Sequence, residues 1–160
     1  MTTLTRIYRF SASHRLHSPE LSRAENQALY GKCNNPFGHG HDYVLEVTVT
    51  GEIDEYSGLI LPRLQLDRLV EEQILSLFAS RNINLDVPQF STLVPTTENI
   101  AIVITNLLEE HWGIYVPGTR THLFRVRLQE TDRNACEIRI SAADRNSASG
   151  RAAERLFIHA

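Results

Sequence analysis

The sequence predicts an α+β domain in which an antiparallel sheet carries two helices on one face. Three patterns predict it: alternating apolar residues over 4–14 and 39–49, two helical apolar periods in the middle, and an alternating hairpin after residue 122. The implied element order is β-β-α-α-β-β. The length of 160 residues fits one domain. We expect that domain to span residues 1–142 and a C-terminal extension to follow at 143–160.

The first two strands are predicted because apolar and polar residues alternate. The face of the first strand that we expect to be buried collects Leu4, Tyr8, Phe10, Ala12 and His14. The corresponding face of the second collects His39, His41, Tyr43, Leu45, Val47 and Val49. Residues 18–38 between them are rich in Ser, Pro, Asn and Gly, and they predict a long irregular excursion. A loop of this length in a compact domain is more often functional than idle.

The two helices are predicted from apolar residues at helical spacing. The stripe of the first consists of Leu66, Leu69, Val70, Ile74, Leu77 and Phe78. After a connector at 82–94, the second begins near Thr96, a good N-cap, with Glu98 in its first turn. We expect Gly113, Pro117 and Gly118 to end it. Two further strands, 124–130 and 136–140, form the final hairpin around a turn at 131–135.

Composition and charge exclude several classes of protein. The chain is 42% hydrophobic and 22% charged, and its net charge of −3 with scattered basic residues argues against a nucleic-acid partner. No apolar run approaches the roughly 20 residues that span a membrane, and the N-terminus lacks the apolar segment of a signal peptide. We therefore expect a cytoplasmic protein without a membrane partner, in which Cys33 and Cys136 stay reduced.

Three histidines have the spacing of a zinc site. His39 and His41 stand at i and i+2 on one strand and therefore point the same way, and His14 ends another strand on its buried face. His17 is a rival for His14, but it lies beyond the strand in a loop that contains proline. Three imidazoles leave one position of a tetrahedral Zn²⁺ open, which is typical of a catalytic rather than a structural zinc.

Other candidate residues allow two interpretations each. Cys33 is either a small buried hydrophobe or a thiol whose pKa falls near a dication, and its polar loop favours the second. Glu130 ends an apolar strand face, either as a group that reaches water or as a buried anchor for a guanidine-like heterocycle. Glu98 is as readily explained by the helix dipole as by a binding role.

At this point several motifs carry a resemblance that covers roughly residues 7–140 in the same order. They are Ser11-Ala12-Ser13-His14-Arg15-Leu16-His17-Ser18-Pro19, Gly31-Lys32-Cys33-Asn34-Asn35-Pro36, Gly38-His39-Gly40-His41, Gly51-Glu52-Ile53-Asp54, Asp86-Val87-Pro88, Thr96-Thr97-Glu98-Asn99 and Glu130-Thr131-Asp132. Together they resemble the 6-pyruvoyl tetrahydropterin synthase family, most closely its animal-type branch.

The resemblance implies the tunnelling fold, with trimers that stack into a homohexamer and sites at subunit interfaces. It implies triphosphate elimination and side-chain rearrangement on 7,8-dihydroneopterin triphosphate, a pterin-like small molecule. It also implies a Zn²⁺ cofactor that polarises the side-chain oxygens of the substrate. By the same resemblance the zinc ligands are His14, His39 and His41, the base is Cys33, and the pterin is bound by Glu130 and by the pocket residues Thr96, Thr97 and Glu98.

The sequence also departs from the family pattern. An Asp-His pair that serves the cysteine as a proton relay is replaced by Ala79 and Ser80, Phe37 and Asp42 stand where asparagines are usual, and a later turn reads Pro62-Arg63. Two hypotheses follow. In the first, the protein is a pterin synthase in which water, His111 or another subunit replaces the relay. In the second, it is a repurposed family member, either a zinc-dependent lyase or cyclase on another substrate or a pterin-binding protein.

Overall fold

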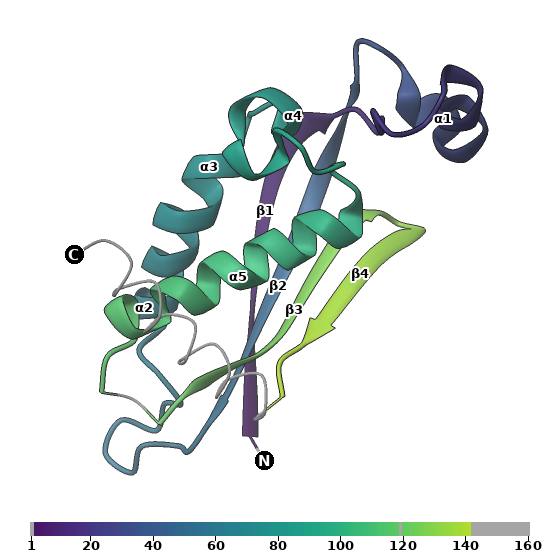
Figure 1. Cartoon of the computed structure of the whole chain (residues 1–160). Helices are drawn as coiled ribbons and strands as arrows, with labels where there is room; N and C mark the ends of the chain where they lie inside the picture. Colours follow the sequence, from purple (N-terminus) through teal and green to yellow (C-terminus); the bar gives the residue numbers. More distant parts are fainter. Residues whose placement is uncertain (1, 119, 142–160) are drawn as a thin grey trace.

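Four strands form one antiparallel sheet in the order β1-β2-β3-β4 (Figure 1). The structure is a computed structural model that describes residues 2–118 and 120–141, so the predicted extension at 143–160 lies outside the described residues. The strand bounds are β1 Thr2–His14, β2 His39–Gly51, β3 His122–Thr131 and β4 Asn134–Arg139. The prediction of an α+β fold with an antiparallel sheet is confirmed.

The longer helices cover one face of this sheet (Figure 1). A helical stretch without a break runs through α2 Arg63–Val70, the π-helical segment η2 Glu71–Leu75 and α3 Ser76–Phe78. The second long helix is α5 Thr97–Tyr115, which ends between Gly113 and Pro117 as predicted. The remaining short helices are α1 Arg23–Tyr30, η1 Gly31–Asn34, α4 Ile83–Asp86 and η3 Pro88–Phe90.

The hydrophobic core lies between the helices and the sheet face predicted to be buried. Tyr43, Leu45 and Val47 on β2 are fully buried, as are Leu66 of α2 and Ile104 of α5. Burial of a large apolar side chain contributes about 1.5–3 kcal/mol relative to its exposure. The alternating pattern of β2 is therefore a packing requirement, and it also fixes the face on which His39 and His41 stand.

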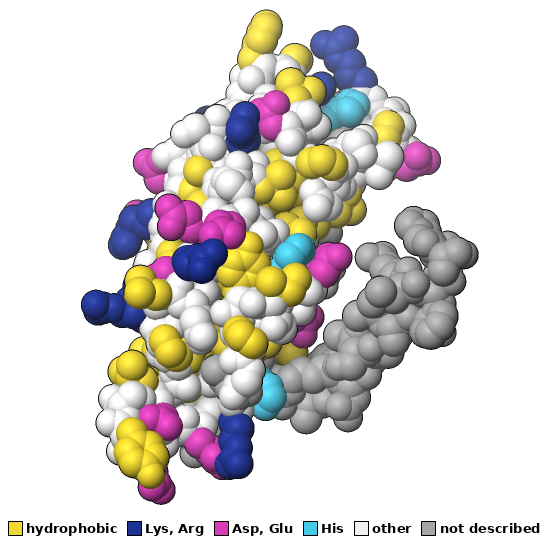
Figure 2. Space-filling view, turned by 90° about the vertical axis from the view of Figure 1, so that its left-hand side faces the viewer, with side chains coloured by type: hydrophobic (Ala, Val, Ile, Leu, Met, Phe, Trp, Pro, Cys, Tyr) yellow, Lys and Arg dark blue, Asp and Glu magenta, His cyan; other side chains and the backbone are white. Residues whose placement is uncertain are grey.

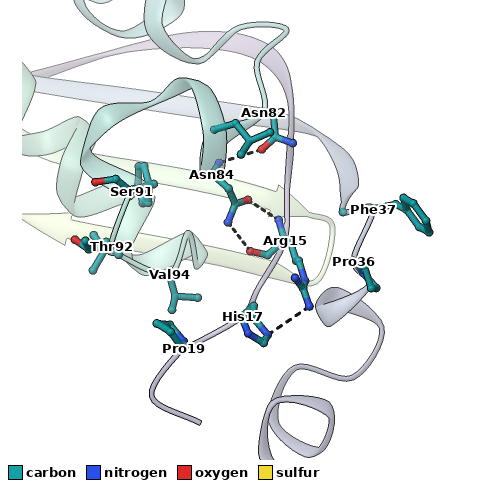
Figure 3. A pocket seen from close by; sticks show the side chains of 14 residues that line it. Arg15, His17, Pro19, Pro36, Phe37, Asn82, Asn84, Ser91, Thr92 and Val94 are labelled. Atoms are coloured by element: carbon teal, nitrogen blue, oxygen red, sulfur yellow. Dashed lines mark hydrogen bonds between the residues drawn. The ribbon is translucent and has the colours of Figure 1, made fainter. Parts of the chain in front are cut away.

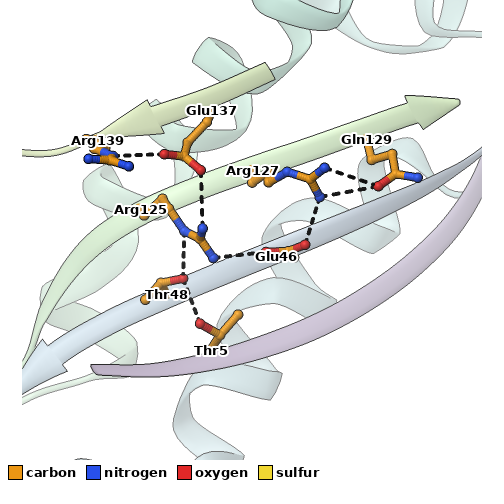
Figure 4. A network of polar contacts seen from close by, with 8 residues as sticks. All are labelled: Thr5, Glu46, Thr48, Arg125, Arg127, Gln129, Glu137 and Arg139. Carbon is orange, nitrogen blue, oxygen red and sulfur yellow. Dashed lines mark hydrogen bonds and ion pairs between the residues drawn. The ribbon is translucent and has the colours of Figure 1, made fainter. Parts of the chain in front are cut away.

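The opposite face of the sheet is polar, and none of the helices within residues 2–118 and 120–141 covers it (Figure 4). Glu46 accepts from Arg125 over 2.9 Å and from Arg127 over 2.8 Å, and Arg125 also donates to Thr48 Oγ1 over 3.1 Å. These residues point away from the core because they alternate with the buried positions of β2 and β3. Paired charges let this face stay hydrated without an apolar covering.

The excursion at 18–38 is more regular than predicted. It contains α1, whose N-terminus forms a capping box: Ser22 Oγ accepts from the Glu25 amide over 3.3 Å, and the Glu25 carboxylate accepts from the Ser22 amide over 2.8 Å. The prediction of an irregular segment was wrong here because α1 buries only Asn26 and therefore has no apolar stripe. Figure 1 shows α1 beyond the ends of the strands, away from the core.

Two surface properties agree with the composition. Within residues 2–118 and 120–141, no helix combines the length and apolarity that crossing a membrane requires. On the face drawn in Figure 2, Lys and Arg side chains stand at separate points rather than in one cluster.

Candidate metal centre

The ladder between β1 and β2 brings three histidines together. His14 pairs directly with His39, and Ala12 pairs with His41, so all three rings stand on the helix-covered face at the same end of the sheet. The ring centroids lie 4.7 Å apart for His14 and His39, 5.1 Å for His14 and His41, and 4.7 Å for His39 and His41. The register that buries the core therefore also assembles the cluster.

The ring nitrogens fit a shared metal ion. One nitrogen from each ring lies within 4.8 Å of the others, and His14 Nε2 and His39 Nε2 are 3.2 Å apart. Two ligands of a tetrahedral zinc, each about 2.0–2.1 Å from it, stand about 3.3 Å apart. Buried His41 Nε2 and His39 Nδ1 have no hydrogen-bond partner within the described chain. An orphaned ring nitrogen facing two others is what a cation would satisfy.

The surroundings of His14 fix its tautomer. The ring is buried, and its Nδ1 donates to the Pro95 carbonyl over 2.8 Å, which leaves the Nε2 lone pair free for a metal. Burial lowers the pKa of His14, and burial together with His41 lowers the pKa of His39. Both shifts favour the neutral imidazoles that metal binding requires.

The Glu130 carboxylate closes the cluster from β3. Its Oε1 lies 3.4 Å from His14 Nε2 and 3.9 Å from His41 Nε2, and its side chain is only 12% exposed. Because the pKa of His14 is lowered, this contact is favourable only with a proton or a cation between the two groups. Asn134 Nδ2 donates to the other oxygen, Oε2, over 2.8 Å and to Thr97 Oγ1 over 2.9 Å.

Cys33 lies close enough to Glu130 to feel its charge. The thiol is free and half-buried, and its loop is anchored where the Cys33 carbonyl accepts from the Leu16 amide over 2.9 Å. Burial and the Glu130 carboxylate raise the pKa of the Cys33 thiol. The protein groups alone therefore do not activate this thiol, and the lowered pKa expected from the sequence requires a nearby cation.

Other predicted residues lie farther from the cluster. His17 Nδ1 donates to Asn34 Oδ1 over 2.9 Å instead of facing the cluster, so His14 rather than its rival meets His39 and His41. Thr96 is the N-cap of α5, as predicted, and its hydroxyl accepts from the Asn99 amide. Glu98 is exposed, and burial together with the Glu98 charge raises the pKa of the Cys136 thiol. His111 Nδ1 donates to the Leu107 carbonyl within its own helix.

The expected relay positions lie beside the edge of β1 that faces away from β2, and the backbone of residues 80–82 is bonded to that edge. The Ser80 amide donates to the Ser11 carbonyl over 2.7 Å, and the Ser80 backbone has a φ of 60°, the left-handed region that few residues other than glycine adopt. A cavity of about 380 Å³ is lined by Ser80 and Arg81 together with His41 and Asp42. Positions 80–82 therefore line the same cavity as His41, but neither they nor Ala79 supply an imidazole.

Two groups of the site escaped the sequence analysis. Asn134 joins Glu130 to Thr97, and the Pro95 carbonyl orients His14. Neither has a clear local signal, because the bond from Asn134 to Thr97 and the bond from His14 to the Pro95 carbonyl form only through long-range packing. The one available hint was the position of Asn134, which lies four residues after Glu130, on the other side of the predicted hairpin turn.

Fold and site together define an α+β protein with a three-histidine cluster that could hold a metal ion. The profile of the family described as "6-pyruvoyl tetrahydropterin synthase" matches residues 3–141. A match of this extent places the chain in that family: it is a member of the 6-pyruvoyl tetrahydropterin synthase family.

Individual relatives agree. The chain is 44% identical over 131 residues to the human 6-pyruvoyl tetrahydrobiopterin synthase, covering 82% of this chain and 86% of the relative. It is 43% identical over 131 residues to the enzyme of the same name from Poecilia reticulata, covering 82% and 85%. The solved structure of Caenorhabditis elegans 6-pyruvoyl tetrahydropterin synthase superimposes with a TM-score of 0.78 at 38% identity, covering 88% of this chain and 96% of that one.

Proposed function

We propose that this protein is a Zn²⁺-dependent lyase that eliminates triphosphate from 7,8-dihydroneopterin triphosphate and rearranges the side chain of the product. The observation that carries the proposal is the convergence of His14, His39 and His41 with the Glu130 carboxylate at 3.4 Å from His14 Nε2. Family membership and relatives named as synthases of this type support it.

Each residue of the cluster receives a role in this proposal. His14, His39 and His41 hold Zn²⁺, which when bound supplies Lewis-acid polarisation of the substrate's side-chain oxygens. Cys33 Sγ takes a carbon-bound proton from that side chain. Glu130 accepts hydrogen bonds from the ring N–H and the exocyclic amine, since each carboxylate oxygen has two lone pairs and Asn134 uses one of them.

The pocket around the ring is also part of the proposal. Thr97 is buried and joined to Glu130 through Asn134, which supports its role in pterin binding. We assign Thr96 and Glu98 to the same pocket as residues that contact the ring in the assembled protein. The assembly we propose is a homohexamer of two trimers. The described part of the sheet supports it, because the edge of β4 and most of the edge of β1 have no strand partner there; only the His14 end of the β1 edge is bonded, to residues 80–82. A cytoplasmic location and the division of the chain at residue 142 stay predictions.

A turnover assay tests the reaction. Zinc-loaded protein is incubated with 7,8-dihydroneopterin triphosphate, and released inorganic triphosphate and product mass are followed together. Release in step with a new dicarbonyl pterin is expected, and a His39→Ala variant should lose both the zinc and the activity. Zinc content that is unchanged in His39→Ala would contradict the metal assignment. An intact pterin after prolonged incubation with wild-type protein would contradict the reaction.

A second candidate function is favoured by Ala79 and Ser80, which cannot move a proton as an Asp-His pair does. Loss of a general acid or base typically costs about 10²- to 10⁴-fold in rate. The alternative is therefore a repurposed member: a zinc-dependent lyase or cyclase on another substrate, or a pterin-binding protein. The double variant Ala79→Asp/Ser80→His separates the two, because histidine tolerates the left-handed backbone found at position 80. Activity on the triphosphate that appears only in the double variant would favour repurposing.

A further inference from the structure

A cavity of about 330 Å³ lies between the connector that follows α4 and the two ends of the excursion (Figure 3). Small-molecule sites begin at about 300 Å³, so the volume is sufficient for a ligand. Several residues that line it are sequence neighbours of the histidine cluster. Arg15 follows His14, Gly38 precedes His39, and Val94 precedes Pro95, whose carbonyl orients His14. The cavity and the histidine cluster are therefore built by adjacent residues.

The lining of this cavity is basic and neutral. Arg15 and His17 contribute the basic side chains, Asn82, Asn84, Ser91 and Thr92 contribute neutral polar ones, and no aspartate or glutamate is among the described lining residues. A pocket with a guanidinium and without carboxylates favours an anion over a cation or a neutral ligand.

Arg15 differs from the other partly buried arginines of the described chain. Those others, Arg6, Arg125 and Arg127, each bind a carboxylate within 3 Å. Arg15 is half-buried as well, yet within residues 2–118 and 120–141 no carboxylate lies within ion-pair distance of it. A partly desolvated guanidinium without a counter-ion is unfavourable unless a ligand supplies the charge.

The Arg15 guanidinium is held in place for such a ligand. Its Nε donates to the Asn34 carbonyl over 3.1 Å and its Nη2 to Asn34 Oδ1 over 3.3 Å, while the backbone of Arg15 is bound on both sides by Asn84. These bonds leave Nη1 without a partner in the described chain. A neutral donor could make the same hydrogen bonds to Asn34, so these bonds alone do not explain why position 15 carries a positive charge.

We propose that this cavity binds a phosphate chain and that Arg15 is its phosphate-binding residue. The guanidinium fork matches the oxygen spacing of a phosphate group, and charge-assisted bonds of this kind are stronger than neutral ones. In the proposed function the phosphate chain is the triphosphate of the substrate, held beside the metal centre while the pterin ring lies toward Glu130. This identification of the ligand rests on the proposed function, whereas the anion site itself does not.

Calorimetric titration with inorganic triphosphate tests the site without any pterin. The protein is the full chain treated with a chelator that is then removed, so that zinc cannot coordinate the probe. We expect saturable binding of one triphosphate per chain that weakens about 10- to 100-fold in Arg15→Gln, recovers in part in Arg15→Lys, and stays within twofold of wild type in Arg23→Gln. Arg23 is the matched control because it is an exposed arginine on α1 outside the cavity.

Two further measurements separate this proposal from a purely structural role. Neopterin, which lacks the phosphates, should bind wild type and Arg15→Gln equally, and both should hold equal amounts of zinc. No saturable triphosphate binding by wild type, or equal affinities in wild type and Arg15→Gln, would overturn the proposal. Triphosphate binding through Arg15 without turnover of dihydroneopterin triphosphate would overturn the proposed function and leave the anion site standing. Turnover of dihydroneopterin triphosphate with an unchanged KM in Arg15→Gln would overturn the role of Arg15 in phosphate binding and leave the proposed function standing.

Discussion

Replacing Asn134 by alanine tests whether this first residue of β4 fixes the carboxylate that faces the three histidines. Its Nδ2 group donates to Glu130 Oε2 over 2.8 Å and to Thr97 Oγ1 over 2.9 Å, so one amide joins the β3–β4 hairpin to the first turn of α5. The alanine variant removes both bonds. Asn134→Asp is a stronger perturbation because it puts a second carboxylate against Glu130.

The size of the effect follows from these bonds. A hydrogen bond to a charged group contributes about 1.5–3 kcal/mol. Asn134 is exposed, so water replaces part of the lost bond, and we take the lower end of that range. Since about 1.4 kcal/mol corresponds to a tenfold change in affinity, Asn134→Ala should weaken pterin binding by about tenfold. Asn134→Asp should weaken it further, because like charges at this distance repel each other.

Fluorescence titration with neopterin measures the affinity, and metal analysis of the same samples measures bound zinc. Arg133→Ala is the control, since Arg133 directly precedes Asn134 in the turn of the hairpin and its side chain has no bond in the described structure. Zinc content should stay at the wild-type level, because Asn134 binds the carboxylate oxygen that faces away from the histidines. Neopterin affinities within twofold of wild type in both Asn134 variants would refute the reasoning.

Three further predictions concern stability and metal content. Gly38→Ala should destabilise the protein and lower its zinc content, because φ at Gly38 is +69° and a Cβ atom there would lie 2.8 Å from the His14 carbonyl oxygen. Gly58→Ala is the control for backbone strain alone, since Gly58 has a φ of +70° and no atom would lie near its Cβ. Equal losses of zinc in the two variants would contradict the steric argument. Asp67→Asn should lower the free energy of unfolding in urea by about 1–2 kcal/mol, because the carboxylate accepts a bidentate pair from Arg6, and an unchanged urea midpoint would contradict this. Removal of the metal should lower Tm reversibly, since zinc at about 100 times its Kd adds about 2.7 kcal/mol, and a Tm that does not depend on zinc would argue against a site in the folded state.

The sheet and the histidine cluster were predictable because both depend on the period of a strand. Alternation that buries Tyr43 and Leu45 also places His39 and His41 on the same face, so one pattern predicts both the core and the histidine cluster. The direct pairing of His14 with His39 needs more information, because it depends on the register between two strands that residues 15–38 separate.

Other features were beyond the sequence because their causes are not apolar periods. Helix α1 depends on the capping box at Ser22 and Glu25, a signal of two residues that does not repeat along the chain. Asn134 becomes part of the site only when the hairpin packs against α5. The positive φ of Ser80 occurs where its amide donates to the edge of β1, and no residue type in that stretch predicts it.

The pairing of His14 with His39 has a mechanical consequence. Residues 15–38 leave the sheet at His14 and return to it at His39. A metal ion bound by both rings would therefore link the two ends of this segment. Bringing the ends of a loop together costs conformational entropy, and the free energy of metal binding would offset part of that cost. Arg15 and Cys33 both belong to this segment. A bound metal ion would therefore restrict Cys33 and Arg15 together, and amide hydrogen exchange across residues 15–38 should be faster in the metal-free protein than in the metal-loaded one.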